Sequence, residues 1–189
     1  MKKNITSKQL NIAMLGHKRI PSREGGIEIV VEELSTRMVE KGHRVVSYNR
    51  SGHHVAGAEF DGKGMTTYKG VKLKSVLTIN RKGLAAVTSS VLASLAVAFG
   101  KYDVVHVHAE GPAFMCWLPK LFGKRVIVTV HGLDWARAKW GKFASWYIRS
   151  GEKNAVKFAD EIIVLSAGVK KYFRDTYGRE TAFIPNGVN

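Results

Sequence analysis

The amino-acid sequence predicts an α/β fold with a Rossmann-like, doubly wound parallel sheet. Two observations lead to this class. Short apolar runs alternate with segments of helical periodicity along the 189 residues, and polar or glycine residues follow several of the apolar runs. Repeated strand, helix, strand order is typical of a parallel sheet covered by helices on both faces. The length and the 45% of hydrophobic residues suffice for a single domain, residues 1–189, with its own core.

The first repeat lies near the N-terminal end. Residues 12–15 form a short apolar run and are expected to be a strand. Apolar residues then recur at helical spacing, which predicts a helix ending near Gly42. These residues are Ile27, Val30, Val31, Leu34 and Met38. A second strand is expected at residues 45–48.

The same alternation continues to the C-terminal end. Residues 52–74 are rich in Gly and Lys, which predicts a loop with one or two short strands. Further strands are expected at residues 73–77, 104–107, 126–130, 162–165 and 182–184. Helices are expected at residues 84–99, 113–122, 143–158 and 167–176.

Charge and cysteine content restrict the partners and the compartment. Thirty Lys and Arg against 15 Asp and Glu give a net charge of +15, which favours nucleic acid, an anionic membrane surface or phosphorylated substrates as partner. No nucleic-acid-binding motif accompanies this charge, so nucleic acid is not expected.

The lone Cys116 excludes an intrachain disulfide and fits a reducing cytoplasm. The N-terminal residues lack the apolar region of a signal peptide. The uncharged residues 83–100 predict a buried helix rather than a membrane span, since they are short and contain Thr and Ser.

A glycine pair marks the start of the first helix. A polar, basic loop follows the first strand and ends at Gly25 and Gly26. Glycine lets a ligand approach the backbone, and the amides at a helix start attract anions such as phosphate. A plain tight turn is the alternative. The dinucleotide-binding fingerprint is absent, because Gly16 has no G-x-G-x-x-G pattern around it.

Polar residues gather at the carboxyl ends of four expected strands, where doubly wound sheets bind their ligands. His106, His108 and Glu110 follow one strand, and His131 and Asp134 follow the next. Gly16 and Ser166 follow two others. Two alternatives exist for these residues. The first is a zinc site formed by the histidines and Asp134, but nothing in the sequence indicates supporting hydrogen bonds to the ligands or a four-ligand geometry. A serine hydrolase is disfavoured because no G-x-S-x-G motif occurs.

In motif order these segments resemble the N-terminal domain of glycosyltransferase family four. The matching segments are Gly25-Gly26-Ile27-Glu28, residues 103–112, His131-Gly132-Leu133-Asp134-Trp135 and residues 184–188. The resemblance covers nearly the whole chain and is strongest to enzymes that build bacterial surface polysaccharides, including the rhamnosyltransferase-like group. It implies the N-terminal half of the two-domain GT-B fold.

The resemblance also implies an activity. Such enzymes transfer a sugar from a nucleotide-diphosphate sugar to an acceptor hydroxyl, with retention of configuration and without a metal. Gly25 and Gly26 are implied to face the donor diphosphate, and His131 to contact the donor sugar as the catalytic residue. His108, Glu110 and Asp134 are assigned to the substrate or its diphosphate. No cofactor and no metal site are expected.

The acceptor is expected to be lipid-linked or a polysaccharide. The nucleotide-binding domain of such enzymes has no counterpart in this sequence, so the chain by itself is expected to be inactive. The alternative is a non-catalytic α/β module that binds phosphorylated or lipid-linked sugars at an anionic membrane surface. A nucleotide-dependent reductase is disfavoured, because the dinucleotide-binding fingerprint is missing and Tyr48-Asn49-Arg50 stands after the second strand where an acidic residue would be needed.

A basic helix with aromatic residues adds a membrane hypothesis. Basic residues and one tryptophan recur every three or four positions, and would form one stripe beside an apolar stripe that includes Trp140, Phe143 and Tyr147. The basic stripe comprises Lys139, Lys142, Trp146, Arg149, Lys153 and Lys157. Such a helix suits the anionic surface of a membrane, and equally an ordinary solvated face. We expect a cytoplasmic protein, with peripheral contact at the inner face of the cell membrane as a hypothesis.

Overall fold

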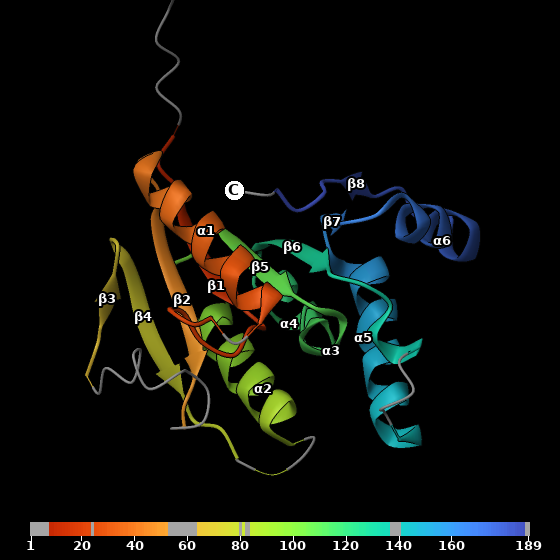
Figure 1. Cartoon of the computed structure of the whole chain (residues 1–189), viewed down its shortest axis with the longest axis horizontal. Coiled ribbons are helices and arrows are strands. Elements are labelled where there is room, and N and C mark those ends of the chain that lie inside the picture. Colours follow the sequence, from red (N-terminus) through yellow and green to blue (C-terminus); the bar gives the residue numbers. More distant parts are fainter. Residues whose placement is uncertain are drawn as a thin grey trace, which may run out of the picture.

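The computed structural model describes residues 8–23, 25–52, 64–79, 81, 84–136 and 141–187. Its centre is an eight-stranded sheet in the order β3-β4-β2-β1-β5-β6-β7-β8 (Figure 1). All neighbouring strands run parallel except β3 and β4, which form an antiparallel pair at one edge. The predicted α/β fold with a parallel sheet is confirmed.

The elements agree closely with the sequence-based expectations. The strands are β1 (Asn11–Leu15), β2 (Arg44–Arg50), β3 (Thr67–Tyr68), β4 (Val71–Val76), β5 (Val104–His108), β6 (Arg125–Val130), β7 (Glu161–Val164) and β8 (Ala182–Phe183). The helices are α1 (Gly26–Glu40), α2 (Leu84–Ala98), α3 (Glu110–Ala113), α4 (Trp117–Leu121), the short 3-10 helix η3 (Asp134–Ala136), α5 (Lys142–Phe158) and α6 (Ala167–Tyr177).

One expected helix is wrong in detail. Residues 113–122 form the end of α3, a turn and then α4, rather than a single helix. Pro119 explains the interruption, because it has no N–H to donate to the preceding turn and is tolerated only in the first turn of a helix. Pro119 accordingly lies in the first turn of α4.

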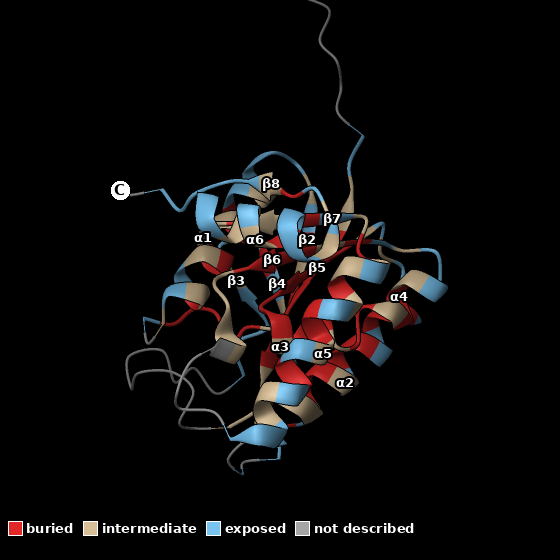
Figure 2. Cartoon of the chain, turned by 90° about the vertical axis from the view of Figure 1, so that its right-hand side faces the viewer, coloured by how far each residue is buried: buried red, intermediate tan, exposed pale blue. Residues whose placement is uncertain are grey.

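Alternation along the strands produces two cores, one on each face of the sheet. Residues such as Leu15, Val107, Val128 and Val164 face α2 and α5 in the larger cluster, while Met14 packs with residues of α1 in the smaller one. Figure 2 shows that the buried residues concentrate in the strands and on the inner sides of the helices. Within the described residues, no helix has both the length and the apolar character to cross a membrane.

The strand order places a topological switch between β1 and β5. The chain winds from β1 toward β2 on one side and from β5 toward β6 on the other, so a crevice opens at the carboxyl ends of β1 and β5. Gly16, directly after β1, has a φ of +103°, and a Cβ there would lie 2.2 Å from the backbone oxygen of His108. Only glycine allows these two strand ends to come so close.

Candidate functional site

A cleft of about 820 Å³ lies at this switch point. Its lining comes from the loop after β1, the start of α1, the ends of β2, β5 and β6, and the first turns of α2 and α5. Among the lining residues are Gly25, Gly26, His131 and Asp134, four of the residues that the sequence assigned to a site. Residues from the two halves of the sheet are therefore brought together as the strand-end pattern predicted.

The glycine pair leaves the start of α1 open to the cleft. Gly25 is the N-cap residue, and no side chain caps the helix. The amides of the first turn thus have no side-chain acceptor at the cap, which suits an anion. A Cβ at Gly25 would meet Glu28 Oε2 at 2.1 Å, whereas a Cβ at Gly26 would meet nothing within 4 Å. Glu28 is held by Lys18, whose backbone N–H donates to Glu28 Oε1 (3.0 Å).

A row of three histidine rings crosses the site on the face of the sheet that α1 covers. His106 Nε2 is hydrogen-bonded to Thr129 Oγ1 (2.7 Å), and the rings of His106 and His108 stack with centroids 4.2 Å apart. His108 Nδ1 then meets His131 Nε2 at 3.2 Å. Only His131, at the end of this row, reaches the cleft.

Burial keeps these rings uncharged. It lowers the pKa of His106 to about 4 and the pKa of His108 well below its usual value. Burial also lowers the pKa of His131, although the nearby carboxylates of Asp134 and Glu28 oppose this. At neutral pH the cleft therefore presents a neutral imidazole, which hydrogen-bonds without adding positive charge.

His108 and Glu110 lie behind the wall of the cleft rather than in it. Both side chains are fully buried, and neither lines the cleft. Glu110 Oε2 accepts a hydrogen bond from the backbone N–H of Asp134 (2.8 Å), so this carboxyl supports the loop after β6. Direct substrate contact, expected for both residues, is not what this geometry offers. Strand alternation correctly placed both residues at the carboxyl edge of the sheet. It could not predict that they lie beneath the loop that follows β6.

Glu110 belongs to a buried carboxyl pair. Its Oε1 is buried and meets Glu152 of α5, with no donor beside it. Burial and this neighbour raise the pKa of Glu110 to about 9, because two carboxyl groups in contact favour one shared proton. Glu152 accepts hydrogen bonds from Trp135 Nε1 (2.9 Å) and Tyr172 Oη (2.9 Å), and from the hydroxyl of Tyr177. The pair thus ties α3, η3 and α6 to α5.

Comparison with protein families decides the identity. The model of Glycosyltransferase Family 4 matches residues 24–189. The chain belongs to Glycosyltransferase Family 4. Comparison with curated proteins gives no significant match.

Solved glycosyltransferase structures share the fold of this family 4 chain. Sucrose-phosphate synthase from Thermosynechococcus elongatus aligns with a TM-score of 0.63 at 19% identity, over 96% of this chain and 49% of that one. HepE from Anabaena, in complex with UDP and glucose, aligns with a TM-score of 0.65 at 13% identity, over 96% and 45%. A UGT transferase from Siraitia grosvenorii, in complex with UDP, gives 0.58 at 11% identity, over 95% and 51%. The chain spans about half the length of these structures. The expected GT-B half-fold is confirmed.

Several polar residues of the cleft were not assigned to a site by the sequence, among them one each from α1, β2 and α5. Glu28, Arg50 and Tyr147 all line it, from α1, the last position of β2 and α5. Arg50 had an available signal, since it follows an apolar strand at the carboxyl edge of the sheet. Tyr147 had none, because helical periodicity places it in an ordinary core stripe.

The metal alternative has no support in the described part of the chain. There, no group of three or more His, Cys, Asp or Glu side chains is arranged to hold a metal ion. His106 and His108 stack on each other and engage Thr129 and His131 instead.

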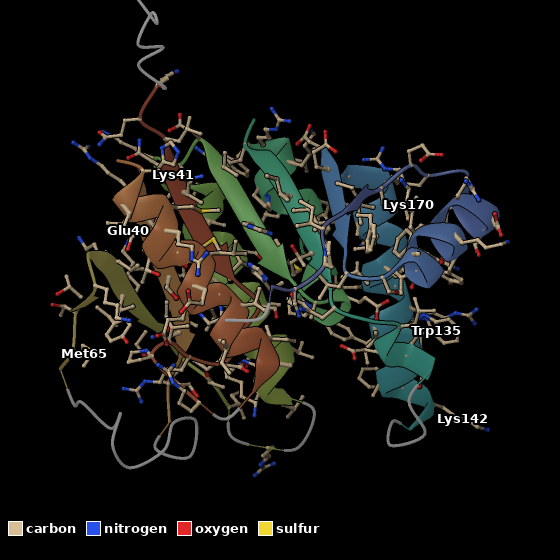
Figure 3. All side chains as sticks on the ribbon, turned by 45° about the horizontal axis from the view of Figure 1, so that its top comes forward. Glu40, Lys41, Met65, Trp135, Lys142 and Lys170 are labelled. Atoms are coloured by element: carbon tan, nitrogen blue, oxygen red, sulfur yellow. The ribbon has the colours of Figure 1, made fainter. Side chains whose placement is uncertain are left out.

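The predicted basic stripe lies on the outer side of α5. Lys142, Trp146, Arg149 and Lys153 are all exposed, while Lys139 and Trp140 lie outside the described residues. Figure 3 shows Lys142 at the free end of α5, pointing away from the sheet. The Arg149 guanidinium stacks over the Trp135 ring, 4.4 Å from its centroid.

The expected apolar stripe beside it differs from the structure in one residue. Phe143 is 71% exposed and packs against Trp146, with ring centroids 5.9 Å apart. Tyr147, Ile148, Gly151 and Ala155 form the buried side instead. Phe143 lies in the first turn of α5, where it lines the mouth of the cleft instead of entering the core.

Proposed function

We propose that this family 4 chain is the acceptor-side domain of a retaining glycosyltransferase, which moves a sugar from a nucleotide-diphosphate sugar to a lipid-linked or polysaccharide acceptor. One observation carries the proposal: the open start of α1 at Gly26 and the imidazole of His131 line the same cleft at the switch point of the sheet. An anionic leaving group and a sugar hydroxyl are the groups that these two features would bind.

The donor is proposed from the chemistry of the cleft and from structural likeness. HepE binds UDP and glucose, and the Siraitia grosvenorii transferase binds UDP. We propose that a diphosphate reaches the amides of α1 at Gly25 and Gly26, and that a second domain outside this sequence holds the nucleoside. In that arrangement the 189-residue chain alone does not turn over.

His131 is proposed to act on the sugar of the donor. During transfer the bond from the anomeric carbon to the diphosphate oxygen breaks, the acceptor oxygen bonds to that carbon, and the proton of the acceptor hydroxyl passes to an oxygen of the leaving diphosphate. Positive charge develops on the sugar and negative charge on the diphosphate. A neutral imidazole hydrogen-bonds the sugar without repelling this positive charge, and the helix amides stabilise the leaving group. Asp134 lines the cleft three positions after His131 and is proposed to orient sugar hydroxyls.

The proposed location follows from the acceptor and from the charge. We propose a cytoplasmic protein that contacts the inner face of the cell membrane, where lipid-linked sugars present their head groups. The net charge of +15 and the exposed basic residues of α5 support this.

An activity assay tests the function. The product of the entire gene and the 189-residue chain are each incubated with UDP-, GDP- and TDP-sugars and with polyprenyl-diphosphate-linked sugars, and release of nucleoside diphosphate is measured. The entire product should release it with configuration retained in the new glycoside, and the chain alone should not. Inverted product would contradict the retaining mechanism. Turnover by the chain alone would contradict the need for a second domain.

A further inference from the structure

The cleft contains a cation that the donor diphosphate at α1 does not account for. Arg50, the last residue of β2, lines the cleft, and its Nε is buried without a hydrogen bond. Among the described residues, its guanidinium has no ion pair and no side-chain hydrogen bond. Burial lowers the pKa of Arg50, but a guanidinium stays protonated at any ordinary pH. Arg50 is half-buried, and a guanidinium whose Nε is buried without a partner is costly, which points to a ligand that accepts a hydrogen bond and supplies negative charge.

The groups around Arg50 leave its Nε without a partner. Glu28 is the carboxylate that acts on it, and Glu28 already accepts from Lys18 N (3.0 Å) and fills the space beside Gly25. His17 lies nearby as a neutral ring, its pKa lowered to about 4 by burial, and bonds to Ser47 Oγ (2.8 Å). Lys18 lines the same cleft and adds positive charge. Asp134 also lines the cleft, so the two cations face two carboxylates, and the unpaired Nε of Arg50 rather than a net charge favours an anion at this point.

Tyr147 offers a second unused donor at the same place. Its hydroxyl is buried and makes no hydrogen bond of good geometry; it lies beside the Ser90 hydroxyl, which donates to Ala86 O (2.6 Å). Tyr147 and Arg50 act on each other electrostatically across the cleft. A phenol O–H and a guanidinium that line the same cleft suit the oxygens of a phosphate group.

An apolar wall adjoins this polar pair. The first turn of α2 contributes Ala85, Ala86 and Val87, and α5 contributes Phe143, Ala144 and Ile148. Phe143, 71% exposed, stands where this wall reaches the solvent. A saturated or isoprenoid chain fits such a wall, because burial of apolar surface is the main gain available there.

We propose that Arg50 and Tyr147 bind the phosphate of an amphipathic acceptor, whose apolar chain lies against α2 and α5. The role of this ligand as acceptor rests on the proposed transferase function, while the phosphate-binding site itself does not. The site is separate from the amides at the start of α1, so donor and acceptor phosphates would occupy different parts of one cleft.

Binding of small probes to the 189-residue chain tests the site. Octyl phosphate, kept below its micelle concentration, is titrated by calorimetry and compared with inorganic phosphate, octanol and UDP. Wild type should bind octyl phosphate at least about tenfold more tightly than either inorganic phosphate or octanol, since head and chain both contribute. Arg50→Gln should weaken octyl phosphate by about tenfold or more, and Tyr147→Phe by less.

Arg44→Gln is the matched control. Arg44 stands at the opposite end of the same strand and is exposed, so the variant changes the net charge equally without touching the cleft. It should bind octyl phosphate as wild type does. If Arg50→Gln and Arg44→Gln bind alike, the site is overturned. Should Arg50→Gln unfold, Tyr147→Phe decides in the same way.

The other probes assign the phosphate to its source. Equal affinity for inorganic and octyl phosphate would overturn the amphipathic ligand and leave a free-phosphate site. Loss of UDP binding in Arg50→Gln would assign Arg50 to the donor and overturn the acceptor assignment. If the entire gene product transfers sugar but the 189-residue chain does not bind octyl phosphate, the phosphate site is wrong and the proposed function stands. If octyl phosphate binding depends on Arg50 but the entire gene product transfers no sugar, the proposed function is wrong and the phosphate site stands.

Discussion

His108 Nδ1 lies 3.2 Å from His131 Nε2, so a fully buried histidine holds the ring that faces the cleft. Each neutral imidazole has one N–H donor and one acceptor nitrogen. The contact therefore requires complementary tautomers in the two rings, and the tautomer of His131 fixes whether its other nitrogen donates to or accepts from a bound sugar. His108 is a positioning residue on this view.

Replacement of His108 should impair turnover of the entire gene product without removing a substrate contact. His131→Ala should reduce kcat by about 100-fold or more if His131 acts at the reacting centre. His108→Leu should reduce kcat by about tenfold, since it removes one buried hydrogen bond, and should change KM for the donor little. His108→Asn, whose amide lies near the position of Nδ1, should restore most of this loss.

Steady-state kinetics with a thermal melt of each variant checks this prediction. Rescue by Asn but not by Leu separates positioning from packing, because both variants change the core. Equal kcat for Leu and Asn variants, or unchanged kcat in His131→Ala, would contradict the assigned roles.

Much of the fold and part of the cleft were predictable from the sequence. Apolar periodicity gave the helices and strands, because burial of one face repeats with the period of the element. Strand ends predicted that His131 and Asp134 lie at one edge of the sheet, because parallel strands end there, and the glycine pair before the first helix predicted the open helix start at Gly25 and Gly26.

The contacts between helices were not predictable from the same patterns. Gly151 lies inside the expected helix of residues 143–158, at the point where α5 meets the backbone of Glu110. Tyr172 lies within the expected helix of residues 167–176 and Tyr177 directly after it, and the hydroxyls of both donate to Glu152 of α5. Periodicity gives the face that an element buries, but the partner depends on the packing of the whole domain.

Glu110→Gln should change how stability depends on pH. The folded-state pKa of Glu110 is raised to about 9 from a usual 4.5, so the folded state binds more protons than the unfolded chain between these values. Its contribution to stability is thus present at low pH and lost as pH rises toward 9, by at most about 1.4 kcal/mol per pH unit. Gln keeps the acceptor for Asp134 N and donates to Glu152 at every pH, so the variant should gain stability relative to wild type as pH rises.

Urea unfolding from pH 5 to pH 9 measures this difference. Glu180→Gln, at an exposed position, is the control and should show no comparable trend. A constant difference between Glu110→Gln and wild type across the range would contradict the shared proton.

Gly151→Ala should destabilise the domain although alanine favours helices. A Cβ at position 151 would lie 1.9 Å from Glu110 O and 3.0 Å from Phe114 N, both backbone atoms that cannot rotate away. The overlap should force α3 and α5 apart at a cost of about 1–3 kcal/mol, more than the ~1 kcal/mol gained in helix propensity.

Gly168→Ala in α6 provides the matched comparison. A Cβ at Gly168 meets only Ser166 Oγ, at 4.0 Å, so this variant should be neutral or stabilised. Urea unfolding of both variants checks the pair, and equal stability of the two would show that the close approach of α3 and α5 is unimportant.

The basic side of α5 should bind anionic membranes. Lys142, Arg149 and Lys153 are exposed beside the aromatic pair of Phe143 and Trp146, the latter 59% exposed. Each basic residue near an anionic surface contributes about 1 kcal/mol, and the field extends about 10 Å at 0.1 M salt. The chain should therefore sediment with phosphatidylglycerol vesicles at low salt, lose binding steeply as salt rises, and bind phosphatidylcholine vesicles weakly.

Charge reversal distinguishes this surface from the net charge of +15. Lys142→Glu, Arg149→Glu and Lys153→Glu together should abolish sedimentation with phosphatidylglycerol vesicles. Lys41→Glu, Lys72→Glu and Lys101→Glu change the charge equally at exposed positions outside α5, and should retain most of the binding. Arg149 stacks on Trp135, so a thermal melt of the first variant must show an intact fold. Equal loss in both variants would mean that net charge, rather than α5, brings the protein to the membrane, and the lipid-linked acceptor would then reach the cleft without docking of this helix.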